Sequence, residues 1–191
     1  MSTDSNTLDV LLAKIAAHWS TADAVSLVCI DGPAGSGKTT LAAQLAHELR
    51  AQIVHMDDLY DGWEGVERGV EILVTDILTP LFRGVPADYR RYDWGLERYA
   101  ESHQVEPVGS LIVEGCASAT KIVDKFDPFI VWVETEPNVR LARGLARDGE
   151  EVREQWLKFM DRESQIYEAN NTRERAHVHL DGFGQIVEVR G

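Results

Sequence analysis

Hydrophobic positions follow two alternating patterns along most of this chain. Short continuous apolar runs are typical of strands buried on both faces, and they alternate with segments where apolar residues recur every three or four positions, as on a helix face. The runs predict strands at 24–30, 51–56, 110–115, 128–134, 176–182 and 185–190. The periodic segments predict helices at 7–19, 39–49, 136–149 and 150–169, the last two separated at Gly149.

This alternation predicts the fold class. Strands separated by helices pair in parallel through right-handed crossovers, so we predict an α/β protein with a three-layer, doubly wound parallel sheet. The length suits a single domain, which we place at residues 1–191. In such a sheet the ligand lies beyond the carboxyl ends of the strands. Those ends carry the segment 31–39, Asp57, Asp58, Glu114 and Glu134.

Residues 61–109 break the alternation. Their first part carries apolar residues at helical spacing, namely Val66, Val70, Leu73, Ile77 and Leu81. Pro80 should kink or end that helix. The stretch that follows, RGVPADYRRYDWGLERY, is polar, aromatic and rich in arginine, and it lacks the pattern of a core segment. We therefore predict a small helical insert over about 61–109.

Charge and cysteine content narrow the function classes. The formal net charge of −13 argues against a nucleic-acid partner, because a duplex-binding surface needs clustered positive charge. The chain has no apolar run of about eighteen residues and no secretory signal pattern at its start, so we expect no membrane partner. Cys29 and Cys116 each lie at an apolar run and lack close spacing, which predicts buried, reduced thiols in a cytoplasmic protein.

The segment CIDGPAGSGKTTLA, at 29–42, predicts a phosphate site. It meets the pattern G-x-x-x-x-G-K-[ST] and lies between a predicted strand and a predicted helix, which is the context that this motif requires. Its glycines allow backbone turns in which successive N–H groups point inward, and the helix start adds its positive dipole end. We expect contacts to ATP from Gly32, Ala34, Gly35, Ser36, Gly37, Lys38, Thr39 and Thr40.

Other nucleotide-binding classes fit the sequence less well. A dinucleotide fold requires G-x-G-x-x-G, but GSGKTT, which starts at Gly35, lacks the last glycine. No asparagine is followed by lysine, so the base-reading motif of GTPases is absent. Two classes remain, a small-molecule kinase and a regulatory nucleotide-binding module without transfer chemistry.

Acidic residues after two strands favour a kinase. Asp57 and Asp58 follow the strand at 51–56, where a carboxylate can accept the proton of an acceptor hydroxyl in line with the γ-phosphate. Glu114 follows SLIV, which is typical of a carboxylate on the Mg²⁺ side of such a site. The alternative is that these acids only cap turns or face solvent at strand ends.

Four segments together resemble the uridine kinase-like branch of P-loop small-molecule kinases. They are DDLY after the second strand, YRRYDW before the third core strand, the Glu114–Gly115 pair, and the pattern R-x-x-R-x-x-x-R-D formed by Arg140, Arg143, Arg147 and Asp148. The matches run from about residue 25 to 182. Arg90 stands where the family usually has proline.

The resemblance implies roles by position. Asp57 would accept the acceptor proton, and Lys38, Arg143 and Arg147 would neutralise charge on the transferred phosphoryl group. Thr39 and Glu114 would hold Mg²⁺, and residues 136–150 would form a lid. The small-molecule acceptor would be bound by Asp58, Tyr60, Arg91, Tyr92, Asp93 and Trp94.

The sequence leaves several points open. The P-loop also resembles that of bacterial cytidylate kinases, and Arg83, Arg90 and Arg91 could bind the phosphate of a nucleoside monophosphate. The chain has no clear equivalent of the acidic segment with which uridine kinases hold the ribose. The sequence names neither the acceptor nor a preference for ATP over GTP, and it leaves a homo-oligomer open. Whether Asp57 or Asp58 is the base is also open, as is direct or water-mediated ligation by Glu114.

Overall fold

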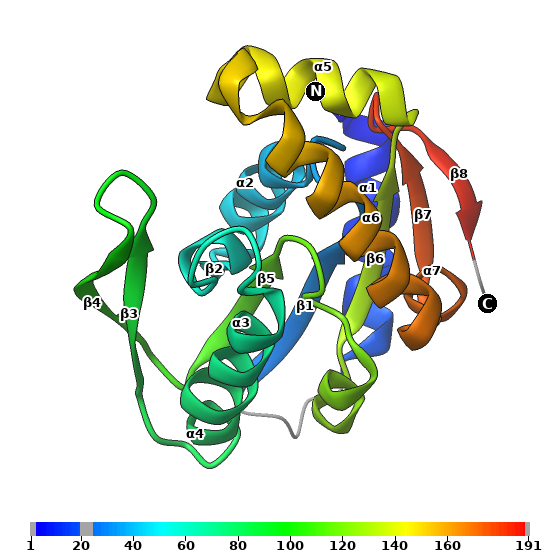
Figure 1. Ribbon diagram of the computed structural model, residues 1–191. Helices are drawn as coiled ribbons and strands as arrows, with labels where there is room; N and C mark the ends of the chain where they lie inside the picture. The colour runs from blue at the N-terminus through cyan, green and yellow to red at the C-terminus, as the bar shows by residue number, and fades with distance from the viewer. Residues whose placement is uncertain (1–2, 20–24, 190–191) are drawn as a thin grey trace.

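A six-stranded sheet forms the centre of the computed structural model, which describes residues 3–19 and 25–189 (Figure 1). The strand order is β2-β5-β1-β6-β7-β8. The strands are β1 (Val25–Asp31), β2 (Gln52–His55), β5 (Gly109–Glu114), β6 (Phe129–Glu134), β7 (Val178–Asp181) and β8 (Ile186–Val189). Neighbours from β2 to β7 are parallel, whereas β8 runs antiparallel to β7. The predicted fold class is confirmed. Two predicted strands, 24–30 and 185–190, each include one residue outside the described ranges.

Helices cover both faces of the sheet, because its strands are apolar on both sides. In β1, Val28 and Ile30 pack against α1 (Ser5–His18) and α2 (Lys38–Leu49). Leu27 and Cys29 alternate with them and face the opposite layer, which contains α3 (Val66–Ile72) and α6 (Arg153–Asn170). This period of two is the geometry of a strand buried on both faces. The three-layer arrangement follows from it.

Further helices lie at both edges of the sheet. Helix α5 (Pro137–Asp148) crosses above the carboxyl edge in Figure 1 and connects to α6 through η4 (Glu150–Val152). The remaining short helices are η1 (Met56–Asp58), η3 (Lys121–Phe126) and α7 (Thr172–Arg175). The predicted helices at 136–149 and 150–169 are thus present, and Gly149 separates them with a φ of 105°.

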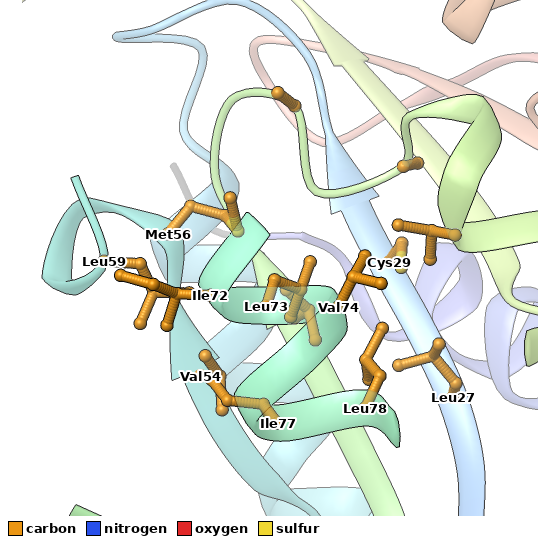
Figure 2. Packing of buried hydrophobic residues seen from close by; sticks show 14 of the residues in the cluster. Leu27, Cys29, Val54, Met56, Leu59, Ile72, Leu73, Val74, Ile77 and Leu78 are labelled. Atoms are coloured by element: carbon orange, nitrogen blue, oxygen red, sulfur yellow. The ribbon is translucent and has the colours of Figure 1, made fainter. Parts of the chain in front are cut away.

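The helical part of the insert packs on the sheet. Helix α3 continues through the π-helical turn η2 (Leu73–Leu78) into α4 (Thr79–Leu81). Figure 2 shows side chains from this segment meeting those of Leu27, Cys29 and Val54 on the sheet. Pro80 lies in the first turn of α4, and the helix ends one residue later. The widened turn lies where the proline ring would otherwise crowd the preceding carbonyls.

The second part of the insert is a β-hairpin, which corrects the prediction of a helical insert. Strands β3 (Ala87–Asp93) and β4 (Arg98–Val105) pair antiparallel and form a separate two-stranded sheet. The expectation that residues 83–99 lie outside the core is also wrong in part, because Ala87 and Tyr89 belong to the main buried cluster. A register shift between Arg90 and Tyr92 marks a β-bulge, which bends a strand and changes which side chains face inward.

Candidate active site

A cavity of about 750 Å³ lies at the carboxyl edge of the sheet. It brings together the P-loop, the segment after β2, the end of β5, and helices α5 and α6. The predicted site residues that line it are Ala34, Gly35, Gly37, Lys38, Thr39, Thr40, Asp57, Asp58, Tyr60, Trp94, Glu114, Arg143 and Arg147. Residues scattered across the sequence therefore meet at the place that the sheet topology predicts.

The P-loop backbone requires glycine at its start and its end. Gly32 has a φ of 133°, and a Cβ there would lie 2.1 Å from the carbonyl oxygen of Val133. Gly37 takes a left-handed conformation with a φ of 105° and forms the N-cap of α2. Side chains are strained or excluded at such positions. The backbone can therefore turn tightly between β1 and α2.

Asp31 braces the P-loop from beneath. Its carboxylate accepts hydrogen bonds from the N–H groups of Gly32 (2.7 Å), Ala117 (3.0 Å) and Ala119 (2.8 Å). The side chain is fully buried, and burial raises its pKa to about 6 although the bonds from Ala119 and Gly32 act in the opposite direction. Asp31 thus ties the P-loop to the loop after β5. Its place at a strand end was visible in the sequence, but this bracing role was not.

Lys38 remains charged although it is buried. Burial lowers its pKa, but the nearby acidic groups, Glu114 and Glu163 among them, outweigh burial and raise the pKa overall. Its Nζ donates to the carbonyl oxygens of Gly32 (2.6 Å) and Pro33 (2.9 Å). The cation is therefore held at the P-loop, where a phosphate oxygen can replace a carbonyl as its partner.

Thr39 and Glu114 form the oxygen pair that the sequence predicts for Mg²⁺. The Thr39 hydroxyl donates to Glu114 Oε1 at 3.1 Å. His55 Nδ1 lies 2.6 Å from the same oxygen, and this hydrogen bond raises the pKa of His55. Hydroxyl and carboxylate oxygens are hard ligands, and Mg²⁺ is commonly held by one or two of them together with phosphate oxygens. The donor set fits that ion. His55 is a site neighbour that the sequence analysis missed.

Asp57 and Asp58 follow β2 on the 3₁₀ turn η1 and line the cavity. Asp57 is solvent-exposed in the cavity. Protein atoms around it raise the pKa of its carboxyl by desolvation, and the charge of Glu114 raises this pKa further, whereas Lys38 and Arg147 lower it. Desolvation also raises the pKa of Asp58. Among the described residues, neither carboxylate has a hydrogen bond or ion pair to a protein group. Both are therefore available to a ligand.

The three arginines of the lid pattern have different surroundings. Arg143 donates to the carbonyl oxygen of Gly35 at 3.2 Å, and Arg147 pairs with Asp148 through two hydrogen bonds of 2.6 and 2.9 Å. Both line the cavity. Arg140 does not, because its side chain is buried against Glu163. The two arginines to which the resemblance gives a role at the phosphoryl group are thus the two that line the cavity.

Aromatic side chains form the wall opposite the P-loop. Trp94 lies at the tip of the β3–β4 hairpin and donates its indole N–H to the carbonyl oxygen of Asp57 at 2.9 Å. Its ring meets Trp63 edge to face at 5.6 Å, and Trp63 in turn meets Trp156 at 6.1 Å. Trp156 and Phe159 of α6 complete the wall. These two were missed as site residues, although their spacing of three in a predicted helix places them on one face.

Three predicted acceptor residues lie behind the wall. Arg91 pairs with Asp93 and Glu101, and Asp93 accepts N–H groups of the hairpin turn. Tyr92 is buried, and its ring meets that of Trp94 at 5.5 Å. None of the three lines the cavity, and neither do Gly32 and Ser36 of the P-loop. The hairpin residues instead hold Trp94 in place.

Comparison with known proteins agrees with this geometry. A family model described as AAA domain matches residues 28–171, which is most of the chain. The chain belongs to this family. A curated cytidylate kinase from Pyrobaculum arsenaticum is 24% identical over 139 residues, which cover 72% of this chain and 68% of that protein. The predicted resemblance to P-loop kinases is thereby confirmed at the level of the family.

Solved structures share the fold. A possible uridine kinase from Bacillus stearothermophilus has a TM-score of 0.66 at 24% identity, covering 92% of this chain and 98% of that one. The YGR205w protein has a TM-score of 0.61 at 15% identity, covering 100% and 98%. A putative fructose transport system kinase from Silicibacter sp. TM1040 has a TM-score of 0.53 at 19% identity, covering 87% and 90%. This chain therefore has the P-loop kinase fold.

Within residues 3–19 and 25–189, no helix combines the length and the apolar character that a membrane span requires.

Proposed function

We propose that this protein is a kinase that uses ATP and Mg²⁺ to phosphorylate a hydroxyl group of a small molecule. The observation that carries the proposal is the meeting, in one cavity, of Lys38, the Thr39–Glu114 pair, the unpaired carboxylate of Asp57 and the lid arginines. A purely nucleotide-binding module needs the first two features but has no need for a free carboxylate beside the phosphates.

Each group has a defined part in the proposed transfer. Lys38, Arg143 and Arg147 neutralise charge on the transferred phosphoryl group, and Asp57 accepts the proton of the attacking hydroxyl. Thr39 and Glu114 hold Mg²⁺, which would supply charge neutralisation at the phosphate oxygens. The raised pKa of Asp57 makes it a stronger base than an ordinary aspartate, although the base must remain ionised at the working pH.

The surroundings of the hairpin arginines favour an acceptor without a phosphate group. Arg90 donates to the carbonyl oxygens of Tyr99 and Ala100, and Arg91 is held by two carboxylates. Neither these residues nor Arg83 line the cavity. The cavity wall beside the hairpin consists of indole rings and two aspartates, which suit a neutral molecule with a flat apolar face and hydroxyl donors. A nucleoside monophosphate remains the second candidate, because the curated relative is a cytidylate kinase.

The test is ADP release with Mg-ATP and a panel of nucleosides, nucleoside monophosphates, pantothenate and small sugars. We expect one phosphate-free acceptor to stimulate release strongly. Asp57→Asn should then lower turnover by about 10²–10⁴-fold with little change in ATP affinity. Asp58→Asn is the matched neighbour that separates the two candidate bases, and Asp88→Asn, on the exposed face of the hairpin, is the control.

The outcomes separate the alternatives. Stimulation by a nucleoside monophosphate alone would replace the hydroxyl acceptor with the second candidate. Tight ATP binding without stimulation by any acceptor, and without an effect of Asp57→Asn, would favour the nucleotide-binding module.

A further inference from the structure

Two buried charged residues lie outside the proposed transfer chemistry. Arg140 of α5 and Glu163 of α6 are 7% and 2% exposed, and Arg140 Nη1 lies 2.6 Å from Glu163 Oε1. Burying an ion pair carries a large desolvation penalty, and apolar residues of similar volume often give equal or greater stability. Stability alone therefore gives no strong reason for charges at these positions.

Both side chains hold the same residue of the P-loop. Glu163 Oε2 accepts the N–H of Ala34 at 2.8 Å, and Arg140 Nη1 donates to the carbonyl oxygen of Ala34 at 3.1 Å. Arg140 Nε also donates to the carbonyl oxygen of Thr135, just before α5, at 3.1 Å. The backbone of Ala34 is thus bonded on both sides by one ion pair, and its N–H is directed at protein rather than at the cavity.

The same pair fixes the base of the lid helix. The backbone of Arg140 packs directly on Gly35, where a Cβ would lie 2.8 Å from the carbonyl oxygen of Arg140. Arg143 lies three residues further along α5 and donates to the carbonyl oxygen of Gly35. The separation between Arg143 and the P-loop is therefore set where Arg140 meets Ala34 and Gly35.

We propose that Arg140 and Glu163 are positioning residues, which bind α5 and α6 to Ala34 and so align the P-loop amides with Arg143. The inference rests on the proposed function only in taking a nucleotide phosphate as the ligand of the P-loop. The proposal gives Arg140 a different role from the other two arginines of the lid pattern. Arg140 acts through the backbone of Ala34, whereas Arg143 and Arg147 line the cavity.

A mutant cycle tests the proposal. Arg140→Met, Glu163→Leu and the double variant are compared with wild type in thermal unfolding and in the affinity for Mg²⁺ and a mant-labelled ATP. Each single variant leaves one buried charge unpaired and should lower Tm by about 10 °C. The double variant should regain Tm to within about 3 °C and yet bind the labelled ATP about tenfold or more weakly. A double variant that regains both Tm and affinity would show a structural pair only.

A second measurement does not depend on nucleotide binding. In the Arg140→Met/Glu163→Leu double variant the N–H of Ala34 loses its acceptor, and the amide exchange of Ala34 should become about tenfold faster while the amides of β1 keep their rates. Glu154→Gln, which removes an exposed partner of Lys158 on the same helix, should leave the exchange rates of Ala34 and of β1 unchanged. Unaltered exchange at Ala34 in the double variant would overturn the proposal. Failure of wild type to bind labelled ATP would instead count against the proposed function.

Discussion

The two ends of the cavity are built in different ways. The proposed phosphate end is made chiefly from residues 31–39, which are close in sequence, and its geometry is fixed by glycines and by short hydrogen bonds to Asp31 and from Lys38. The proposed acceptor end is made from the segment 57–63, Trp94 and Trp156, which are far apart in sequence and meet through tertiary contacts.

Because of this difference, the two ends of the cavity depend on different parts of the sequence. A phosphate site formed by local backbone geometry tolerates little change in its own sequence but does not depend on the shape of the insert. The acceptor wall depends on where the hairpin places Trp94 and on how α6 presents Trp156, so it can change with the insert while the phosphate end stays the same. Variants at the two ends should therefore affect different kinetic constants.

Of the variants that test this comparison, Lys38→Met should have the largest effect on catalysis. Lys38→Met removes the buried cation of the P-loop and leaves the phosphoryl charge with only the lid arginines to compensate it. We expect turnover to fall by about 10²–10³-fold and ATP affinity to fall with it, measured as ADP release and as binding of a labelled ATP. Lys125→Met, at a surface helix, is the control. Retained turnover in Lys38→Met would contradict the phosphate-end assignment.

Gly32 tests how tightly the phosphate end is constrained. A Cβ at Gly32 would lie 2.1 Å from a backbone oxygen, whereas Gly84 in the insert also has a positive φ but no atom within 4 Å of such a Cβ. We expect Gly32→Ala to destabilise the protein by about 3 kcal/mol and Gly84→Ala by about 1 kcal/mol. Urea unfolding measures both. Equal effects would mean that backbone conformation alone, and not contact with Val133, accounts for the cost.

The sequence was sufficient for the main sheet and for the location of the P-loop. Continuous apolar runs and helical periodicity located the strands of the main sheet, and the P-loop pattern placed Lys38 and Thr39 correctly at the start of α2. The topology then placed Asp57 and Glu114 at the same edge. These inferences depend on short-range patterns and on a general rule of parallel sheets.

The acceptor end was only partly accessible to the same reasoning. Tyr89 and Tyr92 of β3 are both buried although they are three residues apart, because Tyr89 belongs to the main core whereas Tyr92 packs against Trp94. A strand with an interrupted period of two is hard to recognise from sequence. Arg140 had the right spacing for the lid, but its burial against Glu163 depends on the packing of α5 on α6, which periodicity does not describe.

Trp94 tests the acceptor end separately. Trp94→Leu removes an indole that lines the cavity and bonds to the backbone of Asp57. We expect the KM for the acceptor to rise about tenfold, with the KM for ATP unchanged, in steady-state ADP release. Trp94→Phe keeps an aromatic face without the N–H, and its KM for the acceptor should lie between those of wild type and Trp94→Leu. An equal rise in the KM for ATP would show that the two ends are not independent.

The smallest effect is expected from Asp57 on stability. Desolvation and the charge of Glu114 hold its pKa in the folded protein above the ordinary value, so ionising this carboxyl disfavours the folded state. The penalty is absent below the unfolded pKa, grows as pH rises from the unfolded to the folded pKa, and is constant above the folded pKa. Asp57→Asn should therefore have a slightly higher Tm than wild type at neutral pH, and the difference should shrink toward acid pH. The acceptor end would then contain a carboxylate that lowers stability, and its proposed role as a base explains its presence better than packing does. A lower Tm of Asp57→Asn than of wild type at neutral pH would contradict this.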